Sequence, residues 1–109
     1  MDYSFIFLMT GALAANLASI ERAVLADAQQ RVQLDPAQLS IVRSEAVTWR
    51  DGSLGCPEPD RLYPQMLVRG YRIRVQAGAA LLDYHASAAG QWLWCPPGRA
   101  REPLPDDAK

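Results

Sequence analysis

The segment from residue 71 to residue 76, YRIRVQ, limits the fold of this chain more than any other stretch. Its side chains alternate between apolar and polar without exception. A period of two is typical of a β-strand with one buried face. We therefore expect three side chains to face a core: Tyr71, Ile73 and Val75. The side chains between them are expected to face water: Arg72, Arg74 and Gln76.

Short connections around this strand predict an antiparallel sheet. Ala77-Gly78 supplies a tight turn, and the residues after it are predicted to form the returning strand, 80–86. A second turn leads to a last strand over 91–95, and an earlier strand is expected over 40–49, where no helical period is present. The connections between the last three strands are too short for parallel crossovers. The sequence thus predicts an antiparallel sheet of about four strands.

An amphipathic helix is predicted before the sheet, over about residues 13 to 33. Apolar side chains there recur at gaps of three and four, which places them on one helical face: Leu13, Leu17, Ile20, Val24, Ala28 and Val32. A helical turn over 36–39 should follow, because Asp35, Pro36 and Gln38 form a capping pattern. The predicted fold class is α+β, with the helix covering one face of the sheet.

The first fifteen residues permit two interpretations. An apolar run, FIFLM, leads into small residues that resemble a signal-peptide cleavage site, which favours export to the periplasm or the medium. The segment before this run has no Lys or Arg and contains Asp2, which is atypical of a signal, so a cytoplasmic location is the alternative. The run is too short for a membrane-spanning helix. We divide the chain into a signal-like segment (1–15), one α+β domain (16–95) and a disordered tail (96–109).

A long irregular loop is predicted over 50–64, between the first two strands. It contains three prolines, which restrict its unfolded states, and one of the two cysteines, Cys56. The other cysteine, Cys95, ends the last predicted strand, and the spacing of the two suits neither a zinc site nor a redox motif. We expect a Cys56–Cys95 disulfide that ties the loop to the sheet. Two separate buried thiols are the alternative.

The loop is the predicted site of function, because a rigid exposed loop needs little further ordering when a partner binds. We expect a non-catalytic exported module that binds a protein or peptide through six residues: Asp51, Ser53, Glu58, Asp60, Arg61 and Tyr63. One alternative is a structural lid that buries Leu54, Leu62 and Tyr63. Another is an accessory domain that associates through its helix. A protease-inhibitor-like protein or a hydrolase is a third. The sequence predicts no oligomeric state.

Side-chain exposure distinguishes the first two functional hypotheses. Exposed charged residues at the tip of the loop would favour the binding module: Glu58, Asp60 and Arg61. An exposed apolar stripe on the helix would favour the accessory domain: Leu17, Ile20 and Val24.

Other functional classes find little support in the sequence. Eleven basic and twelve acidic residues give a formal net charge of −1, which does not suit a nucleic-acid binder. His85, the only histidine, could be oriented by Asp83 toward the hydroxyl of Ser53 or Ser87, but a structural role is the simpler interpretation. One histidine and two bridged cysteines cannot complete a metal site. No cofactor-binding motif is present, so we expect neither a cofactor nor an enzyme.

The three tryptophans are predicted to pack in the core. Trp92 and Trp94 are two residues apart and therefore share one face of a strand, and Trp49 is expected near them across the sheet. An exposed aromatic strip that stacks on a sugar or a peptide is the alternative.

A recurring pattern of residues covers the loop and the strands after it. It consists of WRDGSLGCPEP from Trp49, then Tyr63 and Gln65, then GYRI from Gly70, then Tyr84-His85. This is similar to W-P-D-x-S-L-G-C-P-x-P, Y-x-Q, P-G-Y-x-I and Y-x-Y-H in a family of small uncharacterised bacterial proteins, usually exported. The chain departs from that pattern at three positions: Arg50, Arg69 and Leu82. The resemblance implies an exported α+β domain without an assigned activity.

Overall fold

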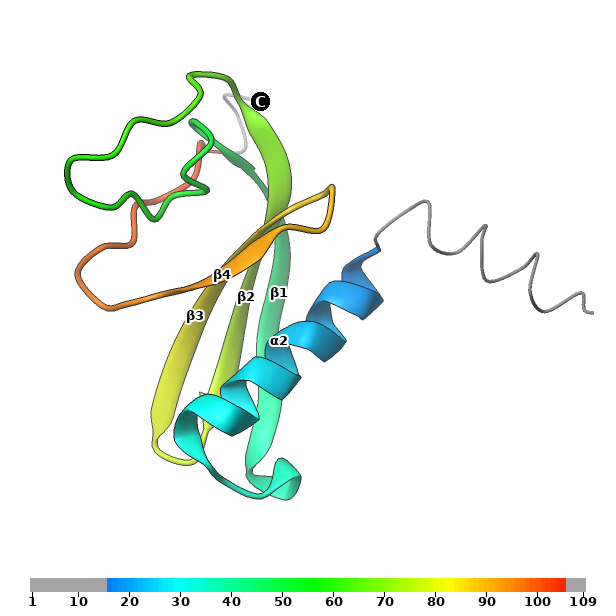
Figure 1. Ribbon diagram of the computed structural model, residues 1–109. Coiled ribbons are helices and arrows are strands. Elements are labelled where there is room, and N and C mark those ends of the chain that lie inside the picture. Colours follow the sequence, from blue (N-terminus) through cyan, green and yellow to red (C-terminus); the bar gives the residue numbers. More distant parts are fainter. Residues whose placement is uncertain (1–15, 106–109) are drawn as a thin grey trace, which may run out of the picture.

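One α-helix packs on a four-stranded antiparallel sheet in the computed structural model, which describes residues 16–105 (Figure 1). The helix is α2 (Leu17–Val32), and the strands follow one another in the sheet in chain order: β1 (Leu39–Trp49), β2 (Val68–Ala77), β3 (Ala80–Ser87) and β4 (Trp92–Cys95). The predicted α+β class and the antiparallel sheet are confirmed. The predicted signal-like segment, 1–15, lies outside the described residues.

Local capping sets the ends of α2. The side chain of Asn16 accepts a hydrogen bond from the backbone N–H of Ser19 at 2.9 Å, and the helix ends at Gln33, whose φ of 56° turns the chain away. The cap predicted at Asp35 is wrong, because its side chain makes no capping bond to the short 3₁₀ turn Pro36–Gln38. The helix thus begins after a capping box that the sequence analysis did not identify.

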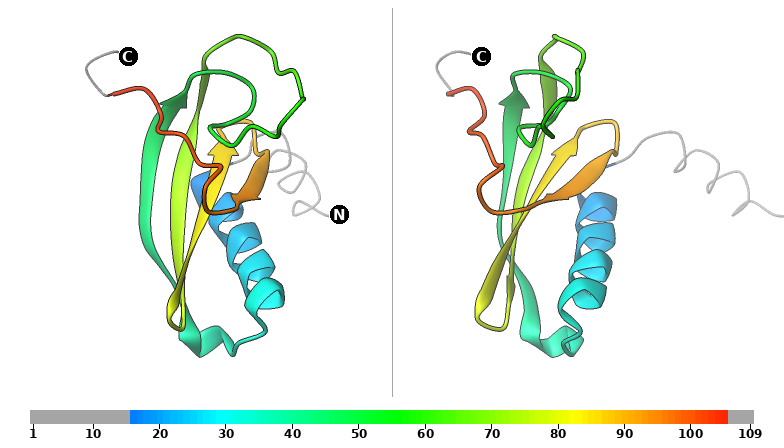
Figure 2. Two further views of the ribbon diagram at one scale, coloured as in Figure 1. Left: turned by 90° about the vertical axis from the view of Figure 1, so that its left-hand side faces the viewer. Right: turned by 60° about the vertical axis from the view of Figure 1, so that its left-hand side comes forward.

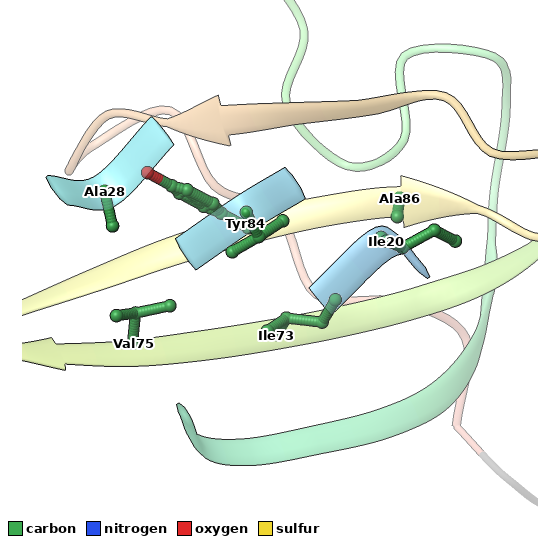
Figure 3. Packing of buried hydrophobic residues seen from close by; sticks show 7 residues of the cluster. Ile20, Ala28, Ile73, Val75, Tyr84 and Ala86 are labelled. Carbon is green, nitrogen blue, oxygen red and sulfur yellow. The ribbon is translucent and has the colours of Figure 1, made fainter. Parts of the chain in front are cut away.

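The main core lies between α2 and the sheet. Ile20, Val24 and Ala28 are buried on the inner face of the helix, and they pack on four buried strand residues (Figure 3): Ile73, Val75, Tyr84 and Ala86. The Tyr84 hydroxyl donates a hydrogen bond to Asp27 of the helix at 2.6 Å. Burial and this carboxylate raise the pKa of Tyr84 above its ordinary value. The apolar stripe predicted for the helix is therefore largely used inside the domain.

A β-bulge in β1 changes which residues face the helix. Ile41 pairs with Val75, but the next paired residue, Arg43, lies opposite Arg74, so that Val42 is the extra residue. A shift of one residue moves all later side chains to the other face. Trp49 consequently points away from α2. The predicted proximity of Trp49 to the other two tryptophans is wrong, because Trp92 and Trp94 pack on the helix side.

The second face of the sheet is also covered, at the end where β1 leads into the loop. Residues 96–105 cross this face on the side opposite α2 (Figure 2). The N–H of Arg101 donates to the carbonyl of Gly55 at 2.8 Å, and that of Leu104 donates to Thr48 at 2.9 Å. The prediction of a disordered tail from residue 96 therefore fails for residues 96–105, and residues 106–109 lie outside the described part.

This second layer explains why Arg72 is buried rather than solvated as predicted. The alternation in β2 is correct, since Ile73 and Val75 face the helix. The opposite face at Arg72 meets the C-terminal segment instead of water. There its guanidinium forms ion pairs with Asp83 at 3.1 Å and with Glu102 at 3.2 Å. Arg74, which lies two residues further along β2, is partly exposed as expected.

Candidate functional site

The candidate site is the loop between β1 and β2, residues 50–67, together with the C-terminal segment 96–105 beside it. The loop lies at one end of the sheet (Figure 1). Burial divides it into an inner segment, residues 51–56, and an outer segment, residues 57–67. The inner segment packs on the sheet, and most of the outer segment is exposed to solvent.

Two stacked rings support the inner segment from below. Trp49, the last residue of β1, stacks on His85 of β3 with 4.4 Å between ring centroids, and both side chains are fully buried. The indole Nε1 donates to the carbonyl of Ala86 at 2.9 Å. The imidazole Nδ1 lies 2.6 Å from the carbonyl oxygen of Leu54, within the loop itself. His85 thus supports the inner segment of the loop through its contact with Leu54.

Two glycines of the quoted pattern permit this packing. Gly55 has a φ of +71°, and a Cβ atom there would lie 2.5 Å from the ring of Trp49. A Cβ atom at Gly70 would collide with the carbonyl of Ala86, the same group that accepts the hydrogen bond of Trp49. The space beside the tryptophan is therefore available only to glycine.

Asp51 and Ser53, two of the predicted binding residues, shape the inner segment. One carboxylate oxygen of Asp51 accepts hydrogen bonds from the backbone N–H of Ser53 at 2.9 Å and from its hydroxyl at 2.6 Å. This is a local turn in which an Asp side chain replaces a backbone acceptor. Ser53 is buried, and Gly52 donates to the carbonyl of Pro64 at 2.9 Å, which closes the neck of the loop. Ser53 is therefore not available at the surface for direct contact with a partner.

The predicted disulfide is confirmed. Cys56 at the end of the inner segment is bonded to Cys95 at the end of β4, and the two Cα atoms lie 5.8 Å apart. Both cysteines are buried. The bond fixes the point at which the inner segment of the loop passes into the outer segment.

The outer segment presents the other predicted residues at the surface. Glu58, Asp60 and Arg61 are exposed, and Glu58 and Arg61 form an ion pair of 2.7 Å at the surface. Tyr63 is half-buried; its hydroxyl accepts a hydrogen bond from the N–H of Glu58 at 3.0 Å. Leu62 is 96% exposed. The lid hypothesis is thus correct for Leu54, which is buried, and wrong for Leu62.

A hollow of about 360 Å³ lies between the loop and the C-terminal segment. Three arginines line it: Arg50 and Arg61 of the loop, and Arg101 of the C-terminal segment. Leu62 and Tyr63 supply an apolar wall. The contribution of the C-terminal segment was missed by the sequence analysis, because its prolines and charges have the composition of a tail and carry no periodicity.

A charged cluster beneath the C-terminal segment was also not predicted. Asp83 lies 3.1 Å from Nη2 of Arg72 and 3.1 Å from Nε2 of His85. Burial alone would raise the pKa of Asp83, but the hydrogen bonds and charges of His85 and Arg72 outweigh it and hold the pKa below its ordinary value of 3.8. Asp83 and its two partners thus form a compact ionic link between β2 and β3.

Two further features are absent from residues 16–105. No group of three or more His, Cys, Asp or Glu side chains in this part of the chain is arranged to hold a metal ion. None of its helices combines the length and apolar character needed to cross a membrane.

A family model described as "Domain of unknown function (DUF8738)" matches residues 21–95. The chain belongs to this family. The matched range runs from the second turn of α2 to Cys95, so the DUF8738 domain includes the whole sheet, the loop and both cysteines. No curated protein and no solved structure matches the chain. The residues that carry the resemblance noted in the sequence lie mostly in the interior of the domain: Trp49, Ser53, Leu54, Cys56, Gly70, Ile73, Tyr84 and His85.

Proposed function

We propose that this DUF8738 domain is a non-catalytic, exported bacterial binding module, which contacts a protein or peptide through the outer segment of its loop. The observation that carries the proposal is the contrast within the loop. Its inner segment is buried and anchored to Cys95, whereas Leu62 a few residues later is 96% exposed. An anchored loop loses little conformational entropy on binding, and an exposed leucine offers apolar area to a partner.

The accessory-domain alternative receives less support. It needs an apolar helix face that is open to a partner, and Ile20 and Val24 are instead buried against the sheet. The two exposure criteria set by the sequence therefore point the same way: the charged tip of the loop is exposed, and most of the helix stripe is not.

The arrangement around His85 supports a non-catalytic role. Its ring is fully buried, and its two nitrogens already face Leu54 and Asp83. The hydroxyl of Ser53 donates to Asp51, and that of Ser87 accepts from the N–H of Gln91 at 3.2 Å. These groups fill structural positions, and a nucleophile with a histidine base would need a hydroxyl within hydrogen-bond reach of the ring.

Export is supported by the disulfide and by the signal-like segment. Disulfides persist in oxidising compartments such as the bacterial periplasm and are rare in reducing cytosol. The bond between Cys56 and Cys95 organises the loop on which the proposed function depends. A periplasmic or secreted location therefore agrees with the proposed role.

Site-specific photo-cross-linking in cells that produce the protein tests the binding role. A benzophenone amino acid is placed at Leu62 or, in a matched control, at Leu81, an exposed leucine in β3 next to the turn after β2. We expect a discrete cross-linked product from position 62 and none from position 81. Equal cross-linking from both positions, or none from position 62, would contradict the proposal. Thermal unfolding of both labelled proteins verifies that the fold is intact.

A further inference from the structure

Uncommitted positive charge is the main feature of the hollow between the loop and the C-terminal segment. Its lining contains three arginines and two acidic residues, Asp51 and Glu102. Asp51 already accepts two hydrogen bonds from Ser53, and both carboxylate oxygens of Glu102 lie 3.2 Å from Nη1 of Arg72. Among the described residues, Glu102 is thus paired with Arg72, one oxygen of Asp51 is bonded to Ser53, and neither carboxylate forms an ion pair with an arginine of the hollow.

Arg50 and Arg101 are the two arginines of the hollow whose N–H donors can bind a ligand. Both are exposed, and within residues 16–105 neither side chain forms an ion pair or a hydrogen bond. The third arginine, Arg61, is paired with Glu58. A guanidinium group carries five donors in a planar fork that fits a carboxylate in a bidentate manner. The charge that best complements this hollow is an anion.

The hollow also has an apolar side, so a ligand that matches it needs an apolar group as well as a negative charge. Leu62 lines the hollow, and Met66 and Leu67 are exposed a few residues later in the loop. These are three of the five large hydrophobic side chains that are exposed among residues 16–105, and the other two, Val42 and Leu81, lie on strands. Exposed apolar side chains in the same loop as a charged hollow suit a chain-like ligand more than a small ion.

The shape of the hollow is fixed before any ligand arrives. Arg101 is held by the hydrogen bond from its backbone N–H to Gly55, and the neck of the loop is closed by the bond from Gly52 to Pro64. The ring of Tyr63 is held by its bond to the N–H of Glu58 and lies beneath the guanidinium of Arg61, 5.3 Å from ring centroid to Cζ. Such preorganisation lowers the entropy lost on association.

We infer that the hollow binds an acidic peptide segment, in which a carboxylate side chain engages Arg50 and Arg101 and a neighbouring apolar side chain packs on Leu62. This inference rests on the proposed function and specifies the chemistry of its partner. A phosphorylated peptide shares the negative charge but not the planar carboxylate. It is therefore a separate arm of the test.

Titration followed by amide chemical shifts in ¹H–¹⁵N spectra detects such binding even when it is weak. The probe is the capped tripeptide acetyl-Leu-Asp-Leu-amide. We expect saturable shifts confined to the amides of residues 50–63 and of Arg101 with its neighbours. The counterparts with Asn for Asp, or with Gly for both Leu, should bind about tenfold more weakly, since each lacks one of the two recognition elements.

Variants of the protein localise the effect. The double substitution Arg50→Gln with Arg101→Gln should weaken the acidic probe by about tenfold or more while leaving thermal stability unchanged, because both side chains are exposed. The matched control is Arg22→Gln, which removes an exposed arginine of α2 far from the hollow and should leave binding unchanged.

Three results would overturn the inference: equal binding of the Asp and Asn probes, binding that survives the double substitution, or no binding at all. Tighter binding of a phosphoserine probe, or equally tight binding of acetate or inorganic phosphate alone, would overturn it too, because the hollow would then be a phosphate or bare anion site. A cross-link from Leu62 without binding of the acidic probe leaves the proposed function standing and removes only this inference. Absence of that cross-link removes the proposed function itself.

Discussion

Trp49 and His85 lie ring on ring, with 4.4 Å between their centroids and 20° between their planes, beneath the inner segment of the loop. The indole is fixed by its hydrogen bond to Ala86, and the imidazole extends to Leu54 on one side and to Asp83 on the other. This pair connects the end of β1, the middle of β3 and the loop. The loop is thus held by buried side chains as well as by the disulfide.

The geometry of His85 predicts which ring nitrogen donates to the loop. The carbonyl oxygen of Leu54 can only accept a hydrogen bond, so the bond between them is donated by the Nδ1–H group. We expect an Nδ1–H signal for His85 in long-range ¹H–¹⁵N NMR spectra. An Nδ1 atom without a proton would contradict this expectation.

Acid sensitivity should depend on Asp83. Its pKa in the folded protein is lower than the ordinary value of 3.8. At pH values near and below 3.8 the unfolded chain therefore binds more protons than the folded one, so this contribution to stability is complete above about pH 5 and is lost as the pH falls through the folded pKa. Asp83→Asn should lower the free energy of unfolding at pH 7 and flatten its fall between about pH 5 and pH 2. Urea unfolding across this range measures both, and parallel profiles for the two proteins would refute the assignment.

Arg72 and Arg74 should respond differently to truncation although they are neighbours on one face of β2. Arg72 is buried between Asp83 and Glu102, whereas the side chain of Arg74 is 31% exposed and lies 3.9 Å from Asp83. We expect Arg72→Ala to reduce the free energy of unfolding by about 3 kcal/mol, because it leaves a partly buried carboxylate without its main partner. Arg74→Ala should change it by less than about 1 kcal/mol. Similar losses from both would indicate that the C-terminal segment does not cover Arg72.

Gly55→Ala and Gly98→Ala separate packing from backbone strain. Both glycines have positive φ angles, +71° and +90°, so both substitutions carry a backbone strain of about 1–2 kcal/mol. Only at Gly55 does the added carbon meet neighbours, with Trp49 at 2.5 Å and the carbonyl of Arg101 at 2.9 Å. Gly55→Ala should therefore be the more destabilising in chemical denaturation, by about a further 1–3 kcal/mol. Equal losses would show that the contact with Trp49 relaxes freely.

The disulfide should stabilise the domain substantially. It links residues 39 positions apart, which in the chain-entropy model corresponds to about 4 kcal/mol. The double substitution Cys56→Ser with Cys95→Ser should lower the melting temperature and increase proteolysis within the loop. Intact mass after alkylation provides the direct check: no adduct before reduction and two after it. Two adducts without reductant would disprove the bond in the purified protein.

Local patterns in the sequence suffice to predict the helix, the strands and the pairing of the strands. Alternation in 71–76 and short turns after it leave few arrangements other than an antiparallel meander, because both signals are local and depend on backbone geometry alone. The helix was predictable from its 3.6-residue period, since burial of one face is imposed on the segment as a whole. The disulfide followed from there being two cysteines, both beside prolines at chain turns.

The covering of the second face of the sheet, in contrast, depends on contacts between residues that are far apart in the chain. The bulge at Val42 turns Trp49 away from the helix, and one extra residue in a strand leaves no mark in the hydrophobic pattern. The C-terminal segment is held on this face by two backbone hydrogen bonds, to Gly55 and Thr48, and by one ion pair, to Arg72. Such contacts depend on residues distant in sequence rather than on any local period. For the same reason the hollow could not be predicted: Arg50 and Arg101, which line it from two sides, are 51 positions apart in the chain and meet only when the segment folds back across the sheet.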